Sequence, residues 1–231
     1  NCAGGNCPSA GESGNIGSAL RFDGVDDFVN VADPNTLGLR NKDFTVTAWV
    51  NAAALGGGDR TILGMDDLNT NRGLHLIIRN GRPYMGFYNN DTVANATLAL
   101  NTWYHLTFRY NMAAGQQAIF INGVLDSATT GHAPFQGAAM VRIGRWAGGN
   151  YFKGLIDDVR IYDRALSAEE ILSLLSGSFS TKGGGIYATG IMSLTSATLA
   201  CNLADRGGLL YLDRSAAPAF ALFQTSIFAN Q

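Results

Sequence analysis

Charged residues are scarce in this chain. Only 15% of its 231 residues are Asp, Glu, Lys or Arg, against roughly 25% in an average domain. The formal net charge of −2 provides no basic surface for nucleic acid or for an anionic membrane, so we expect no nucleic-acid partner. No run of about 18 apolar residues occurs, which predicts that no helix spans a membrane.

Proline and cysteine are also few, whereas glycine is abundant. The chain holds five prolines, three cysteines and 29 glycines. Hydrophobic residues make up 46% of it, which excludes simple disorder. A composition that is poor in charge and rich in glycine is typical of an all-β domain with many turns.

The cysteines are Cys2, Cys7 and Cys201, and no C-x-x-C pair is present, which argues against a zinc or thioredoxin-like site. Cys2 and Cys7 are close enough in sequence to form a small disulfide loop, as in an oxidising compartment. We expect Cys201 to be a buried thiol. Because the sequence starts at Asn1 without Met or an apolar leader, we expect a mature segment that is secreted, either extracellular or at the cell surface.

Short strand patterns separated by turns follow one another from Ala19 onward. Residues 44–50 alternate apolar and polar side chains, which predicts a half-buried strand. Asn80-Gly81 and Asn122-Gly123 each join two apolar runs, and this dipeptide favours a β-hairpin because a type I′ turn needs positive φ twice. Further strand patterns cover residues 103–110, 141–146 and 155–162. Together they predict an all-β fold, a sandwich of two antiparallel sheets.

One short C-terminal helix is predicted after these strands. Ser167 begins a capping box with Glu170, apolar residues follow, and Gly177 ends the helix. We therefore divide the chain into a Gly/Ser-rich lead-in (1–18), a main domain (19–177) and an apolar, strand-like extension (178–231).

Several motifs in the main domain match a known family in order and spacing. They lie at residues 19–29, 44–50, 100–106 and 121–124, at Ile143-Gly144, and, most specifically, at residues 154–167. With these motifs the chain resembles the laminin-G-like, concanavalin A-like jelly-roll modules of large secreted bacterial proteins. The resemblance implies two packed, curved antiparallel sheets in a jelly roll, often with a structural calcium ion, and roles in glycan binding or adhesion.

Asp157 is the first candidate for a metal ligand. In a regular strand it shares a face with Leu155, Val159 and Ile161, and if that face is the core, its carboxylate needs a cation or several donors.

The turn from Asp23 to Asp26 offers carboxylate and carbonyl oxygens, which are the ligands that calcium prefers. In similar jelly-roll folds a metal joins such a turn to the late strand, so the resemblance implies a structural Ca²⁺ held by Asp23 or Asp26 and by Asp157. The alternative is that Asp157 pairs with Arg160 or Arg21, or caps a turn.

Catalytic patterns are missing. Glycan hydrolases of the resembling fold use two Glu flanking an Asp on one strand, whereas the glutamates here are Glu12, Glu169 and Glu170, outside any such pattern. His75 and His105 lie inside strand patterns, and we expect them to be ordinary sheet residues. We therefore predict that the chain is not an enzyme.

Two loops combine aromatic rings with polar side chains, as a sugar-binding surface requires. We predict ligand-binding residues at Arg145, Trp146, Asn150 and Tyr151 in the first loop and at Tyr88 and Asn90 in the second. The polar loop 66–72 is expected to lie nearby. The alternatives are that Trp146 packs over the end of the sandwich and that Arg145 pairs with an Asp.

The sequence thus predicts a non-catalytic extracellular binding or adhesion module that contacts a glycan or a surface protein. The extension 178–231 leaves two interpretations open. It adds strands to its own domain, or it pairs with a neighbouring subunit. In the second case the chain is a structural subunit of an extracellular filament or surface assembly, a homo-oligomer built through residues 178–231.

Overall fold

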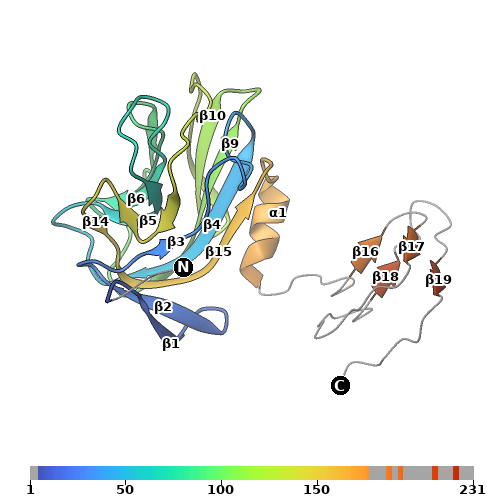
Figure 1. The fold of residues 1–231 in the computed structure, drawn as a ribbon, viewed down its shortest axis with the longest axis horizontal. Coiled ribbons are helices and arrows are strands. Elements are labelled where there is room, and N and C mark those ends of the chain that lie inside the picture. Colours follow the sequence, from blue (N-terminus) through green and yellow to red (C-terminus); the bar gives the residue numbers. More distant parts are fainter. Residues whose placement is uncertain (1–4, 177–185, 189–191, 195–209, 213–220, 224–231) are drawn as a thin grey trace. The chain divides into compact units, whose positions relative to one another are not determined.

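Two antiparallel sheets pack face to face in the computed structural model (Figure 1). The first, sheet A, has seven strands in the order β1-β2-β15-β4-β9-β10-β11. They are β1 (Ser9–Ser13), β2 (Ser18–Asp23), β15 (Lys153–Tyr162), β4 (Phe44–Ala52), β9 (Trp103–Asn111), β10 (Gln116–Ile121) and β11 (Val124–Thr129).

The second, sheet B, has six strands in the order β3-β12-β5-β6-β7-β8. They are β3 (Val29–Asn30), β12 (Val141–Ile143), β5 (Arg60–Met65), β6 (His75–Arg79), β7 (Arg82–Gly86) and β8 (Asp91–Val93). A separate two-stranded hairpin is formed by β13 (Arg145–Trp146) and β14 (Asn150–Tyr151). The prediction of an all-β sandwich of two antiparallel sheets is confirmed.

The structure describes residues 5–176 and the backbone of four short strands beyond them. These are β16 (Ile186–Ala188), β17 (Met192–Leu194), β18 (Leu210–Leu212) and β19 (Ala221–Phe223); β16 pairs with β18 and β17 with β19, both in parallel. The chain divides into two compact units, residues 1–175 and 176–231. The side chains of the predicted extension lie outside the described residues, so its two interpretations stay predictions.

The core lies between the sheets and is rich in aromatic rings. Phe44, Phe87, Tyr110 and Phe135 form one cluster, with ring centroids 5.2 to 6.5 Å apart. All four are fully buried; Phe44 and Tyr110 come from sheet A, Phe87 directly follows β7 of sheet B, and Phe135 lies in a loop. Rings of this size dominate the apolar area that a small sandwich removes from water.

Both Asn-Gly hairpins are confirmed. Asn80 and Gly81 have φ of 50° and 79°, and Asn122 and Gly123 have φ of 50° and 76°. The first turn joins β6 to β7 and the second joins β10 to β11. Positive φ at two successive positions matches the right-handed twist of the strands and fixes the pairing register on either side.

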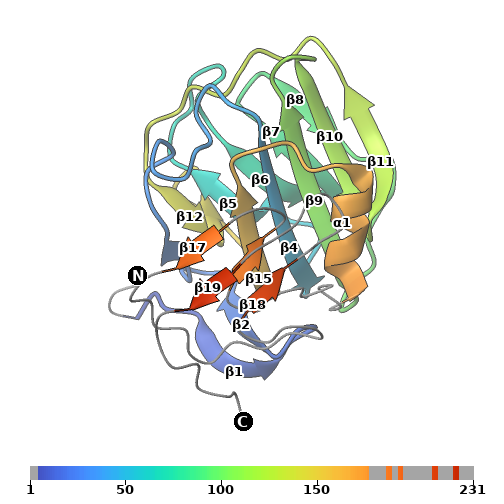
Figure 2. The same ribbon diagram turned by 90° about the vertical axis from the view of Figure 1, so that its right-hand side faces the viewer.

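The short helix is also confirmed, as α1 (Ala168–Ser173) followed by a 3₁₀ turn, η1 (Leu174–Ser176). The Ser167 side chain accepts a hydrogen bond from the Glu170 amide, and the Glu170 carboxylate accepts one from the Ser167 amide at 2.8 Å. These bonds satisfy two amides that the first turn leaves free. Figure 2 shows α1 beside sheet A.

Residues 44–50 form a strand, as predicted, but this strand, β4, is buried on both faces rather than half-buried. Thr45 and Thr47 on the outer face of β4 are as fully buried as Phe44 and Val46 on the core face. The chain before α1 covers this face, because Thr45 Oγ1 donates to the Arg164 carbonyl at 2.8 Å and accepts from the amide of Leu166 at 3.0 Å.

Asp157 does not share a face with Val159 and Ile161. A β-bulge shifts the register between Asp157 and Arg160, with Asp158 at φ 48°. Val159 and Ile161 pack against the core, whereas Asp157 pairs with Trp49 on the outer face of sheet A. An extra residue in one strand reverses the alternation of side chains, and the expectation of a regular strand fails for that reason.

The predicted lead-in contains a strand. β1 pairs with β2 at the edge of sheet A, with Ser9 opposite Arg21 and Ser13 opposite Ser18. Its side chains are almost all exposed, so it carries no apolar alternation that the sequence could reveal.

In the part of the chain that the structure describes, no helix has the length and apolar composition of a membrane span.

Candidate functional site

One residue from each strand of sheet B forms a row across its outer face. We call it the transverse row, and in strand order it consists of Asn30, Arg142, Gly64, His75, Gly86 and Asp91. The neighbours Leu63, Met65, Leu76 and Met85 point into the core, so the row faces outward. His75 is the centre of the row and has a glycine on either side.

The glycine on β7 lets two side chains meet across it. Neighbouring strands lie about 4.8 Å apart, so His75 and Asp91, two strands apart, have backbones roughly 10 Å apart. Even so, His75 Nε2 lies 3.5 Å from Asp91 Oδ1. A Cβ atom at Gly86 would collide with both of these atoms. The absence of a side chain at Gly86 is therefore a condition for this contact.

Planar side chains stack on both faces of the His75 ring. Trp146 of β13 lies 4.4 Å from it between ring centroids at an interplanar angle of 22°, and Tyr84 lies 5.7 Å away at 21°. The Arg79 guanidinium lies 4.5 Å from the centroid of the Tyr84 ring. Arg79 also donates two hydrogen bonds of 2.7 Å to Asp59. We call Trp146, His75, Tyr84 and Arg79 the planar stack.

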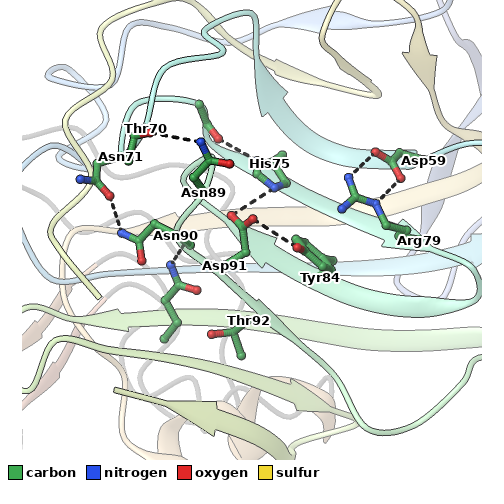
Figure 3. A network of polar contacts seen from close by, with 12 residues as sticks. Asp59, Thr70, Asn71, His75, Arg79, Tyr84, Asn89, Asn90, Asp91 and Thr92 are labelled. Carbon is green, nitrogen blue, oxygen red and sulfur yellow. Dashed lines mark hydrogen bonds and ion pairs between the residues drawn. The ribbon is translucent and has the colours of Figure 1, made fainter. Parts of the chain in front are cut away.

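The planar stack is buried at His75 and exposed at its Arg79 end. His75 is only 2% exposed, whereas the Arg79 side chain is 37% exposed and that of Asp91 is 21% exposed. The Tyr84 hydroxyl donates to Asp91 Oδ2 at 3.2 Å (Figure 3). The outer rim of the stack thus alternates donors and acceptors, namely Asp59, Arg79, Tyr84 and Asp91.

Burial and neighbouring charges influence the protonation states of Tyr84, Arg79 and His75. Burial, together with the charge of Asp91, raises the pKa of Tyr84, so its hydroxyl stays a donor. The hydrogen bonds that Arg79 donates to Asp59 raise the pKa of Arg79, which stays a cation. Burial lowers the pKa of His75, against the opposing effects of the Gly73 carbonyl and Asp91.

The three polar loops that the sequence singled out converge at this face. Asp66 of loop 66–72 contacts Arg145 at 3.1 Å and accepts from the Gly148 amide at 3.1 Å, both in the first predicted loop. On its other side, Asn71 accepts a 2.7 Å hydrogen bond from Asn90 of the second predicted loop. Figure 3 shows this contact beside Asp91. Loop 66–72 therefore bridges the other two.

The residues predicted in the first loop lie against sheet B. Trp146 is 7% exposed, so its ring supports His75 rather than offering an open surface. Arg145 pairs with Asp66 and lies 5.2 Å from the ring centroid of Phe28. The Asn150 carbonyl accepts a 2.7 Å hydrogen bond from Thr61, and Tyr151 pairs with Arg145 across the hairpin.

The residues predicted in the second loop shape the chain between β7 and β8. Tyr88 has a φ of 67° and its carbonyl accepts from the Asn71 amide. The Asn90 side chain donates to Asn71 and to the Ala133 carbonyl, and its oxygen contacts His132 Nδ1 at 2.5 Å. These bonds hold the turn that places Asp91 at the start of β8.

The predicted calcium ligands do not all come together. Oxygens of Asp23, Asp26 and Asp27 lie within 4.8 Å of one another. Burial raises the pKa of Asp27, and the charges of Asp23 and Asp26 act in the same direction. Asp157 is not a member of this group; it is 7% exposed and accepts a 2.8 Å hydrogen bond from the Ile16 amide, so it caps a turn.

Cys7 is disulfide-bonded, while Cys2 and Cys201 lie outside the described residues.

An open surface groove of about 480 Å³ lies away from the planar stack, near the start of β4 and the end of β15. It is lined by Asn35, Thr36, Leu37, Gly38, Lys42, Ile161, Tyr162 and Asp163. None of the predicted ligand-binding residues lines this groove.

Comparison with known proteins gives a consistent result for the fold. A family model described as the concanavalin A-like lectin/glucanases superfamily matches residues 23–172. No curated protein matches the sequence.

Among solved structures, the chain is similar to domain 4 of AbnA, a GH43 extracellular arabinanase from Geobacillus stearothermophilus, determined with arabinotriose. The TM-score is 0.61 at 25% identity, over 74% of this chain and 82% of that one. A putative carbohydrate binding protein from Bacteroides ovatus gives a TM-score of 0.54 at 21% identity, over 67% of this chain and 45% of that one.

The CBM40 domain of the Ruminococcus gnavus IT-sialidase, bound to α2,3-sialyllactose, gives a TM-score of 0.53 at 17% identity, over 64% of this chain and 96% of that one. Two of these three structures hold a glycan, arabinotriose or sialyllactose, and the other is a putative carbohydrate binding protein. At these identities the last two support the fold alone.

Proposed function

The chain belongs to the concanavalin A-like lectin/glucanases superfamily, and from this membership we propose that it is a non-catalytic, secreted glycan-binding module whose site is the outer face of sheet B. The observation that carries the proposal is the planar stack with its polar rim. The disulfide at Cys7 supports a location outside the cell, since disulfides persist in oxidising compartments.

The chemistry of the rim suits a sugar. Sugar hydroxyls both donate and accept, so a surface that alternates donors and acceptors at short spacing binds them well. Arg79 and the Tyr84 hydroxyl donate, and the carboxylates of Asp59 and Asp91 accept. The stack holds these groups rigidly before a ligand arrives, which lowers the entropy lost on binding.

The same contacts favour binding over hydrolysis. Glycoside hydrolysis generally needs one carboxyl group to protonate the leaving oxygen and a second to act as nucleophile or base. Both oxygens of Asp59 accept hydrogen bonds from Arg79, and Asp91 is engaged by Tyr84. Of these two carboxylates, only Asp91 keeps an oxygen that accepts no hydrogen bond from the described residues, and one carboxyl group cannot fill both roles, so we propose no catalytic role for this face.

A glycan array with matched arginine variants tests the proposal. Arg79→Ala removes a charged donor from the rim, and we expect the affinity for the best glycan to fall about tenfold, as for loss of one charged hydrogen bond. Arg21→Ala is the control, since Arg21 also pairs with a carboxylate, that of Glu12, but lies on sheet A. Equal losses in both variants, or no binding to any glycan, would contradict the proposal.

We further propose a structural calcium ion at Asp23, Asp26 and Asp27. Three carboxylate oxygens within 4.8 Å of one another can share one ion with Ca–O distances of about 2.4 Å. The ion would neutralise the charges that raise the pKa of Asp27.

Thermal unfolding with calcium and with a chelator checks this site. We expect the chelator to lower the Tm of the wild type and to have little effect on Asp26→Asn. Asp163→Asn, in an exposed pair with Lys42, is the control and should respond to the chelator as the wild type does. A wild-type Tm that is the same in both buffers excludes a structural ion.

A further inference from the structure

Both nitrogens of His75 face hydrogen-bond acceptors. Nδ1 lies 2.7 Å from the Gly73 carbonyl oxygen, and Nε2 lies 3.5 Å from Asp91 Oδ1. Asp91 Oδ1 is buried and accepts no hydrogen bond from any residue that the structure describes. A neutral imidazole carries one N–H and an imidazolium carries two. Neutral His75 can therefore donate a hydrogen bond to Gly73 or to Asp91, and only the protonated ring can donate to both.

The groups around His75 act on its charge in opposite directions. Asp91 on β8 and Asp59 before β5 favour the cation, and Arg79 on β6 opposes it. Tyr84 on β7 stays uncharged, and Trp146 on β13 does not titrate. The rings of Trp146 and Tyr84 stabilise a cation between them, while burial favours the neutral form. Burial has the largest effect, so the pKa of His75 lies below its usual value, while Gly73 and Asp91 act in favour of the cation.

The protonation state of His75 affects the Tyr84 hydroxyl at the rim, because Asp91 contacts both residues. With His75 protonated, Nε2 donates to Asp91 Oδ1, and Asp91 Oδ2 holds the Tyr84 hydroxyl. With His75 neutral and bonded to Gly73, the lone pair of Nε2 faces a buried carboxylate oxygen. That arrangement is repulsive, so Asp91 turns toward solvent and Tyr84 loses its acceptor.

We propose that His75 is a proton switch for the glycan-binding face: a proton taken from solvent closes the contact with Asp91 above Gly86, orders Tyr84 and tightens glycan binding. This inference rests on the proposed function, since it concerns the regulation of the same site. Because burial lowers the pKa of His75 below the usual value of about 6.5, the unliganded switch operates on the acidic side of that value. By linkage, a bound glycan raises the proton affinity of His75.

The test measures glycan affinity and the state of the His75 ring on the full chain. We expect the wild type to bind at least about fivefold more tightly at about pH 5 than at about pH 8. In Asp91→Asn the amide donates to neutral Nε2 and its oxygen accepts from Tyr84, so the affinity should change less than about twofold over the same range.

His105→Phe is the matched control. His105 is also a buried histidine whose pKa is lowered by burial, but it lies on sheet A against Trp49, so the variant should keep the pH dependence of the wild type. A wild-type affinity that is equal at both pH values overturns the switch, and so does a flat profile in His105→Phe.

Imidazole nitrogen chemical shifts separate a failed switch from a failed function. If no glycan binds at any pH, the proposed function fails, but the switch is still decided without ligand. Titration of His75 with simultaneous shifts of Asp91 and Tyr84 signals supports it. Titration without those shifts, or no titration of His75 between about pH 4 and 8, overturns it.

Discussion

At the scale of single residues, His105 shows how burial controls a titratable group in this fold. Its ring is 1% exposed and packs edge-on against Trp49, with centroids 5.2 Å apart. Burial, and secondarily the charge of Arg160, lower its pKa from 6.5 to about 4. His105 is therefore neutral in the folded protein at neutral pH.

This residue makes stability depend on pH. Between the unfolded pKa and the folded pKa of about 4, the unfolded chain binds a proton at His105 that the folded chain does not. Stability is thus full above pH 6.5 and falls as the pH drops toward 4, by roughly 3 kcal/mol at most. His105→Phe should remove this part of the loss while keeping a ring against Trp49.

Urea unfolding at about pH 7 and about pH 4.5 measures the difference. His75 contributes a loss in the same direction, so the comparison is between the wild type and the variant. If both lose the same free energy of unfolding between the two pH values, His105 is not a buried neutral group in the folded protein.

Most of the candidate site could have been predicted residue by residue from one correct hairpin. The turn at Asn80-Gly81 fixes Arg79 opposite Arg82, and counting back along both strands places Tyr84 opposite Ile77 and His75 opposite Gly86. The stacking of Tyr84 between His75 and Arg79 follows from that register. Asp91 could not be placed in this way, because the turn before β8 has an irregular path with positive φ at Tyr88 and Asn89.

At the scale of elements, α1 is the best case of a structure that local sequence determines. Ser167 and Glu170 satisfy each other's amides, and Ile171 is buried. Ser167→Ala removes an acceptor for the Glu170 amide and should lower the free energy of unfolding by about 1 kcal/mol. Ser167→Asp keeps a capping oxygen and should stay close to the wild type.

Chemical denaturation of these two variants distinguishes a capping effect from a general loss. If alanine and aspartate destabilise the protein equally, the contribution of Ser167 does not come from its cap.

Elements whose form depends on distant parts of the chain were predicted less well. The outer face of β4 is buried because a segment more than a hundred residues later crosses it, from Arg164 to Leu166. The bulge at Asp158 interrupts β15 within a run that reads as a regular strand. Local pattern gives the existence and type of these strands, whereas tertiary contacts decide which faces they bury.

At the scale of the whole molecule, the sandwich brings three loops from distant parts of the sequence to one face. Loop 66–72 contacts the 145–151 loop through Asp66 and the 88–91 loop through Asn71. The predicted residues of these loops mostly hold the backbone, while the rim consists of Asp59 before β5, Arg79 of β6, Tyr84 of β7 and Asp91 of β8. The sequence thus drew attention to loops that converge at the proposed site, and whether their side chains contact a ligand stays a prediction.

The central claim is that glycan binds on the outer face of sheet B. Backbone chemical-shift mapping of the full chain, titrated with the best glycan from the array, tests it most directly. We expect the largest shifts at Arg79, Tyr84 and Asp91, with smaller ones in the hairpin that carries Trp146. Shifts confined to the outer face of sheet A, or to the groove between residues 35–42 and 161–163, would contradict the claim.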